Sequence, residues 1–124
     1  MGILSGLLGN ASQADVEDVE KNLVNVLADG EQVDRAFQLI RDMLIFTRTR
    51  LLIVDKQGMT GKKTEYHSIP YRAITHYSVE TAGHFDLESE LRIWVSGSSD
   101  PIQHTFKAGD AIIAVQKALA TYVK

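Results

Sequence analysis

The spacing of hydrophobic residues changes twice along the chain, and the first pattern is helical. Between residues 13 and 28, apolar side chains recur every three or four positions, as they do along one face of an α-helix. Ser12 precedes this segment as an N-cap, and Gly30 follows it, where glycine tolerates the left-handed backbone that ends many helices. The pattern predicts a helix over residues 13–28. Its apolar stripe consists of Val16, Val19, Leu23, Val26 and Leu27.

From residue 31 to residue 107 the pattern becomes that of short β-strands separated by polar or glycine-containing turns. The clearest alternation places Leu91 and Ile93 on one face and Arg92 and Trp94 on the other. Earlier in this segment, alternate positions are apolar and would face the same side of a strand, with Arg35 as the interruption. These positions are Val33, Phe37 and Leu39. The expected strands span residues 33–39, 43–46, 51–54, 64–69, 74–80, 87–95 and 102–107.

A second helical pattern starts at Asp110, a good N-cap residue. Its stripe includes Ile112, Val115, Leu119 and Tyr122. Short connections between the strands favour antiparallel pairing, because parallel crossovers need about a dozen residues or more. We therefore predict a mainly β fold: a partly open antiparallel barrel of about seven strands over residues 31–107. A C-terminal helix over residues 110–123 caps the barrel, and the N-terminal helix precedes it.

Length and composition narrow the class of protein. The 124 residues fit a single domain over residues 1–124, and a hydrophobic content of 44% is enough for one core without a disulfide or metal. The absence of cysteine excludes disulfides, iron–sulfur clusters and a cysteine nucleophile. No apolar run approaches the roughly 18 residues of a membrane span. We expect a soluble, cytoplasmic protein without stable membrane insertion, whose residues 1–11 form a flexible or interface segment.

Charge is distributed unevenly, although the net charge is only −3. Seven carboxylates lie between residues 15 and 34, whereas eight basic residues lie between residues 35 and 72. A basic loop after the third strand suggests weak binding of an acidic protein or peptide, or of anionic lipid headgroups. Aromatic residues are not interleaved with the lysines, so nucleic-acid binding is not expected. The candidate anionic-partner site consists of Lys56, Lys62, Lys63 and Arg72.

The sequence predicts no enzyme, no cofactor and no metal site. The four histidines lack the helical spacing that places two ligands on one helix face. His84 and Asp86 could act as a base with its orienting carboxylate, but no serine stands in a nucleophile-elbow motif. A small hydrolase using this pair is therefore the alternative to a binding protein.

Trp94 is unusual because the alternation places it outside the core. An exposed tryptophan often marks a protein interface; the other interpretation is that the N-terminal helix of the same chain covers it. The apolar start of the chain also has no place in the barrel. The candidate oligomer interface consists of Trp94, Ile3, Leu4, Leu7 and Leu8.

Thr47-Arg48-Thr49-Arg50-Leu51 has a T-x-x-R-L pattern between two expected strands. This pattern resembles the hairpin of the bacterial pleckstrin-homology domain family and related GRAM-type domains. Residues 56–63, 66–71, 74–83 and 91–97 resemble the segments that follow it. The resemblance extends over nearly the whole chain. It implies seven strands, a C-terminal helix across one barrel mouth and assembly into homo-oligomers, often rings.

One departure from the wider superfamily affects the expected ligand. Phosphoinositide-binding relatives carry a basic motif in a long loop between the first two strands, whereas Ile40-Arg41-Asp42 is short and charge-neutral. The resemblance therefore does not carry over a headgroup site. We expect a non-enzymatic binding or scaffold domain that self-assembles into a closed homo-oligomer and presents a protein-interaction surface. The sequence does not identify the partner, the cellular process or the oligomer size.

Overall fold

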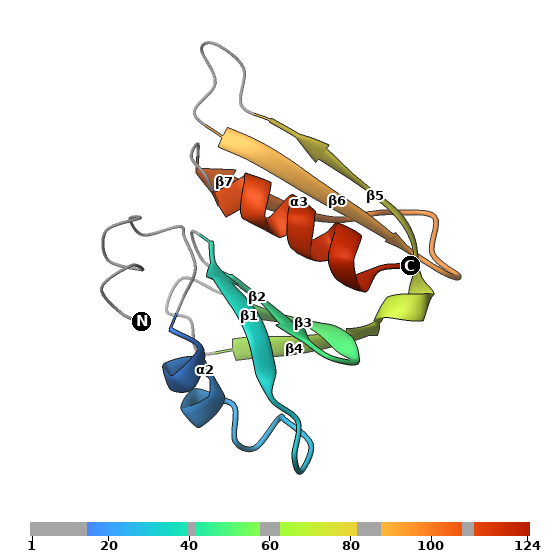
Figure 1. Ribbon diagram of the computed structural model, residues 1–124. Helices are drawn as coiled ribbons and strands as arrows, with labels where there is room; N and C mark the ends of the chain where they lie inside the picture. The colour runs from blue at the N-terminus through green and yellow to red at the C-terminus, as the bar shows by residue number, and fades with distance from the viewer. Residues whose placement is uncertain (1–14, 40–41, 58–62, 82–87, 108–110) are drawn as a thin grey trace.

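The computed structural model describes residues 15–39, 42–57, 63–81, 88–107 and 111–124. Two antiparallel sheets face each other, and the C-terminal helix lies between them in the view of Figure 1. The four-stranded sheet has the order β1-β2-β3-β4, with strands Val33–Gln38, Met43–Thr47, Arg50–Gln57 and Lys63–Pro70. The three-stranded sheet has the order β5-β6-β7, with strands Ile74–Glu80, Glu88–Val95 and Ile102–Lys107.

Two helices and one short turn complete the described elements. Helix α2 spans Val16–Asn22, the 3-10 turn η1 spans Tyr71–Ala73 between the two sheets, and helix α3 spans Ala111–Tyr122. This confirms the mainly β, pleckstrin-homology-like architecture with a C-terminal helix. The described strands remain in two separate sheets, so no closed barrel forms. No helix in the described part is long and apolar enough to span a bilayer.

Helix α2 is shorter than the prediction of residues 13–28. The Asp15 side chain accepts a hydrogen bond from the backbone N–H of Glu17 at 3.0 Å, which makes Asp15 the N-cap. The regular helix ends at Asn22, and the chain continues through turns in which the N–H groups of Val26 and Leu27 both donate to the carbonyl of Leu23. These turns keep the apolar stripe facing the sheet. The predicted cap Ser12 lies outside the described residues.

The prediction that Val33 and Phe37 face the same side of β1 is wrong, because the strand contains a bulge. Val33 pairs with Thr47 and Arg35 with Phe46, so Asp34 is an extra residue in the strand. The extra residue reverses the faces, and Val33 packs beneath α2 while Phe37 points into the core between the sheets.

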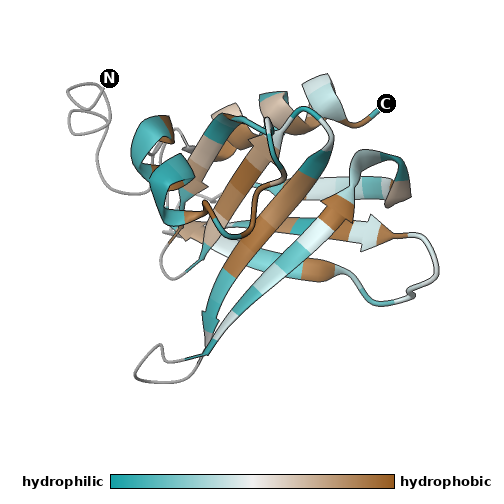
Figure 2. Ribbon diagram, turned by 90° about the horizontal axis from the view of Figure 1, so that it is seen from below, coloured by the Kyte–Doolittle hydropathy of each residue, from teal (hydrophilic) through white to brown (hydrophobic). Residues whose placement is uncertain are grey.

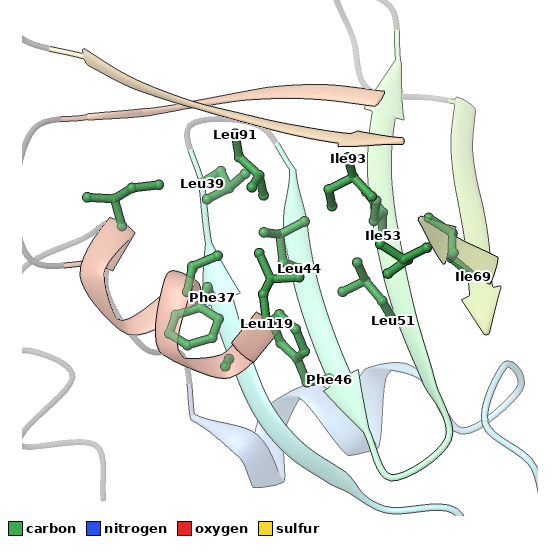
Figure 3. Close-up of a cluster of buried hydrophobic side chains, with 14 of the residues drawn as sticks. Phe37, Leu39, Leu44, Phe46, Leu51, Ile53, Ile69, Leu91, Ile93 and Leu119 are labelled. Atoms are coloured by element: carbon green, nitrogen blue, oxygen red, sulfur yellow. The ribbon is translucent and has the colours of Figure 1, made fainter. Parts of the chain in front are cut away.

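The four-stranded sheet is covered on both faces, which explains the continuous apolar runs of β2 and β3. Leu44 and Leu51 pack into the core against α3 and the second sheet, as Figure 3 shows. Their neighbours Ile45 and Leu52 are equally buried, but on the opposite face and against α2. In Figure 2 the middle strands are brown and α2 is mostly teal, as expected for a helix with one apolar stripe on a hydrophobic sheet.

Helix α3 buries the stripe that the sequence predicts. Ile112, Val115 and Leu119 are buried in the main core, and Tyr122 packs at its edge. The Tyr122 ring stacks on Phe46 and on Tyr71, with ring centroids 5.6 and 5.3 Å apart. Its hydroxyl donates to Asp34 Oδ2 at 3.0 Å. The predicted cap Asp110 lies outside the described residues.

Candidate functional site

The T-x-x-R-L segment forms the tight hairpin between β2 and β3. Thr47 is fully buried, and its Oγ1 accepts the backbone N–H groups of Thr49 and Arg50 at 3.3 and 3.2 Å. Such hydroxyl-to-backbone bonds stabilise a turn. The Tyr71 hydroxyl donates to the Thr47 carbonyl at 2.6 Å. The threonine of the segment therefore shapes the hairpin.

The arginine of the same segment joins three parts of the chain. Arg50 Nε donates to Glu31 Oε2 at 2.9 Å and Nη2 to Glu31 Oε1 at 2.8 Å, which makes a bidentate ion pair. Nη2 also donates to the carbonyl of Val26, and Nη1 donates to Ser68 Oγ. The hydrogen bonds from Arg50 lower the pKa of Glu31 from 4.5 to about 2, against the opposing effect of burial.

A groove of about 650 Å³ lies between this hairpin and the connection from α2 to β1. The carboxylates of Asp29 and Asp34 and the guanidinium of Arg48 line it, so it offers both signs of charge. Its remaining lining residues are Val26, Ala28, Gly30, Glu31, Gln32, Thr49 and Arg50. The sequence analysis missed this groove; the signal that could have found it is the T-x-x-R-L segment.

Trp94 lies on the outer face of the three-stranded sheet. It is the cross-strand partner of His76, and the two rings stack with centroids 4.3 Å apart and planes 15° apart. The Thr75 hydroxyl donates to the Trp94 carbonyl at 3.2 Å. The described part of α2 packs on the other sheet, so the interpretation that this helix covers Trp94 is wrong. His76 is exposed and Trp94 is partly exposed.

The rest of this outer face is polar. Arg92 forms an ion pair with Glu90, and Gln103 donates a hydrogen bond to the same carboxylate. The aromatic pair therefore stands beside a hydrogen-bonded polar network on three paired strands. Flat aromatic area next to polar groups is typical of a protein-interaction surface.

The candidate basic residues do not all lie together. Lys56, near the end of β3, and Lys63, at the start of β4, are exposed on adjoining strands. Arg72 lies in η1, beyond the other end of the eight-residue strand β4, which corresponds to about 25 Å of extended chain. Lys62 lies outside the described residues.

The other predicted site residues cannot be placed. His84 and Asp86, the pair of the hydrolase alternative, lie outside the described residues, as do Ile3, Leu4, Leu7 and Leu8. Within the described ranges, no three His, Asp or Glu side chains are grouped so that they could hold a metal ion.

One cluster that the sequence analysis did not predict connects the two sheets. His104 of β7 is buried, and its Nδ1 lies 2.9 Å from Oδ2 of Asp42, which precedes β2. Burial, together with a hydrogen bond to Asp55, raises the pKa of Asp42, whereas His104 lowers it. These residues come from segments far apart along the chain, which is why no local motif indicated them.

Comparison with known proteins gives relatives along nearly the whole chain. A family model described as a bacterial PH domain matches residues 2–123. An uncharacterized protein of Bacillus subtilis, YjqA, is 53% identical over 121 residues, which are 97% of each chain. A second uncharacterized protein of the same organism, YozO, is 30% identical over 71 residues, which cover 57% of this chain and 61% of that protein.

Two solved structures of pleckstrin-homology domains are also similar to this chain over nearly its whole length. A pleckstrin homology domain from Shewanella amazonensis is 45% identical, with a TM-score of 0.85 and coverage of 99% of both chains. A pleckstrin-homology domain protein from Shewanella loihica is also 45% identical, with a TM-score of 0.79 and coverage of 94% of this chain and 99% of that one. The family model and these structures lead to one conclusion: the chain belongs to the bacterial pleckstrin-homology domain family.

Proposed function

We propose that this chain is a non-catalytic binding domain that self-assembles into a closed homo-oligomer, a ring, and presents a protein-interaction surface. The observation that carries the proposal is the Trp94–His76 stack on the outer face of the three-stranded sheet. Neither residue belongs to the two described core clusters; His76 is exposed and Trp94 is partly exposed. A large flat aromatic side chain supplies much of the binding energy of a protein interface.

Charge supports a head-to-tail arrangement of the copies. Glu17 and Asp18 are exposed on α2, and Asp29 is exposed after it, whereas Lys56 and Lys63 are exposed on β3 and β4. Attraction between an acidic surface on one copy and a basic surface on the next is a heterologous contact. Such a contact closes into a ring if the rotation between copies allows it, and otherwise runs on as a filament.

Light scattering coupled to size exclusion tests the proposal directly. The wild-type chain should give the mass of a defined oligomer at tens of micromolar, and Trp94→Ala should lower that mass while circular dichroism stays unchanged. Tyr66→Ala is the matched control, because Tyr66 is an exposed aromatic residue on the other sheet, 47% exposed. A monomer mass for the wild type that is unchanged by deletion of residues 1–11 would overturn the proposal.

Weak recruitment to anionic partners is a second candidate function, supported by the neighbouring exposed side chains of Lys56 and Lys63. Liposome flotation with anionic and neutral vesicles at low salt tests it, since salt screens exposed charge contacts. Lys56→Glu with Lys63→Glu should abolish the preference for anionic vesicles, whereas Arg72→Glu should not. Equal binding to both vesicle types argues against this function.

Hydrolase activity is the alternative that this proposal sets aside. His84 and Asp86, which would carry it, lie outside the described residues. Broad esterase and phosphatase screens test it: activity that His84→Ala removes would require a catalytic role.

A further inference from the structure

Three titratable side chains meet between the two sheets. Asp42 precedes β2, Asp55 stands on β3 and His104 on β7. Nδ1 of His104 lies 2.9 Å from Oδ2 of Asp42, and Asp55 is close enough to raise the pKa of the Asp42 carboxyl group. The cluster thus contains one imidazole and two carboxyl groups.

The strand pattern directs the side chains of Asp55 and His104 inward. Asp55 follows Leu51 and Ile53, which face the core, and His104 precedes the buried Phe106 by two positions. The side chain of His104 is only 8% exposed and that of Asp42 is 21% exposed. Solvent screens charges at buried positions only weakly. The protonation state of the cluster therefore has a larger effect on the free energy of folding than it would at the surface.

The backbone of Asp42 is held independently of its side chain. Its carbonyl accepts the backbone N–H of Leu39 at 2.7 Å and the side-chain amide of Gln38 at 3.2 Å. Asp42 therefore fastens the end of β1 and the start of β2 together, and its carboxyl group reaches across to β7.

The other described elements around the cluster supply few charges. On β4, Glu65 stands opposite Asp55, and His67 stands opposite Ile53. On β6, Leu91 stands opposite His104 and carries no charge, and the neighbouring titratable group of β5 is Tyr77. The residues that α3 packs into the core, such as Ile112 and Val115, are apolar.

The charge of the cluster changes strongly with pH. With every group deprotonated, two carboxylates face each other beside a neutral imidazole. Protonation of the cluster reduces this repulsion, and a protonated imidazole pairs with the Asp42 carboxylate. Repulsion is then replaced by a charge-assisted hydrogen bond between the sheets.

We propose that Asp42, Asp55 and His104 form an acid-closed latch that fastens β7 to the connection between β1 and β2 as pH falls and releases it as pH rises. The latch lies toward the end of the four-stranded sheet where β1 and β3 finish and β2 begins. Lys56 and Lys63 lie at the same end. The latch would regulate how firmly the two sheets are held together there.

The direction of the pH dependence follows from the pKa of Asp42 and from the charge that His104 needs for its ion pair. The pKa of Asp42 is raised above 3.8 in the folded protein, first by burial and then by Asp55. A raised pKa contributes stability that is fully present below 3.8 and is lost as pH rises through the folded value. The ion pair with His104 is also lost as pH rises, because it requires a protonated imidazole. Both effects loosen the latch as pH rises.

Amide hydrogen exchange followed by NMR tests the latch at the N–H of Leu39, which donates to Asp42. After correction for intrinsic exchange, protection should be roughly fivefold or more higher at about pH 5.5 than at about pH 8. Asp55→Asn and His104→Gln should each flatten this pH dependence. Glu65→Gln and His67→Gln are the controls, because they remove titratable groups from the same face of β4 and should keep the wild-type dependence.

A second measurement keeps the proposal falsifiable if His104→Gln perturbs folding. Carboxyl ¹³C NMR should show that the pKa of Asp42 falls in Asp55→Asn, because one of its raising causes is removed. Wild-type protection that is equal at both pH values overturns the latch. So does an Asp55→Asn variant that keeps the full pH dependence of exchange.

Discussion

Arg50 holds Glu31 through two nearly parallel hydrogen bonds, 2.9 Å from Nε to Oε2 and 2.8 Å from Nη2 to Oε1. The pair ties β3 to the connection between α2 and β1, so the arginine of the T-x-x-R-L segment positions the helix that covers the outer face of the first sheet. The same guanidinium bonds to the carbonyl of Val26 and to Ser68 Oγ.

Removing this arginine should destabilise the fold. Arg50→Ala leaves Glu31 partly buried without its partner, and we expect a loss of about 2 kcal/mol in the free energy of unfolding. Urea denaturation measures it. Arg48→Ala is the control, because Arg48 is exposed at the tip of the same hairpin and surface substitutions stay within about 0.5 kcal/mol. Equal stability of the two variants would show that the ion pair does not hold α2 in place.

The same pair should make stability fall in acid. The folded-state pKa of Glu31 is lowered from 4.5 to about 2, so its contribution is present above 4.5 and is lost as pH falls through about 2. Glu31→Gln should therefore be less stable than the wild type at neutral pH, and the difference should shrink between these two values. Denaturation curves across this range measure the difference; one that is constant with pH would contradict the assignment.

Both faces of β3 should matter for stability. Leu51 and Leu52 are each fully buried, one in the main core and the other beneath α2. Leu51→Ala and Leu52→Ala should each cost about 2–5 kcal/mol, because both leave a cavity. If Leu52→Ala instead behaved like Val24→Ser, at a position 70% exposed, α2 would not cover the sheet in solution.

Tryptophan fluorescence should report on the Trp94–His76 stack. The chain contains one tryptophan, so its emission comes from this site. The rings lie 4.3 Å apart, so the imidazole forms part of the immediate environment of the indole. The emission spectrum should change in His76→Gln and stay unchanged in His67→Gln, which is the control. A His76→Gln variant with the wild-type spectrum would mean that the rings separate in solution.

The local periodicity of apolar residues was sufficient to predict most of the helices and strands. The stripe of Ile112, Val115 and Leu119 predicted α3, and the alternation of Leu91 and Ile93 with Trp94 predicted the inner and outer faces of β6. These patterns can be read from the sequence because each depends on neighbours within a few positions of the same element. The family resemblance came from equally local segments, above all the hairpin that begins at Thr47.

The tertiary structure decided what depends on residues distant along the chain. The bulge at Asp34 turned Val33 to the opposite face, because the register of β1 is set by its pairing with β2. Glu31 and Arg50 are 19 positions apart, and Asp42 and His104 are 62 apart. No periodicity connects such residues; they meet because two sheets and a helix pack around one core, and packing brings together side chains that the local pattern leaves independent.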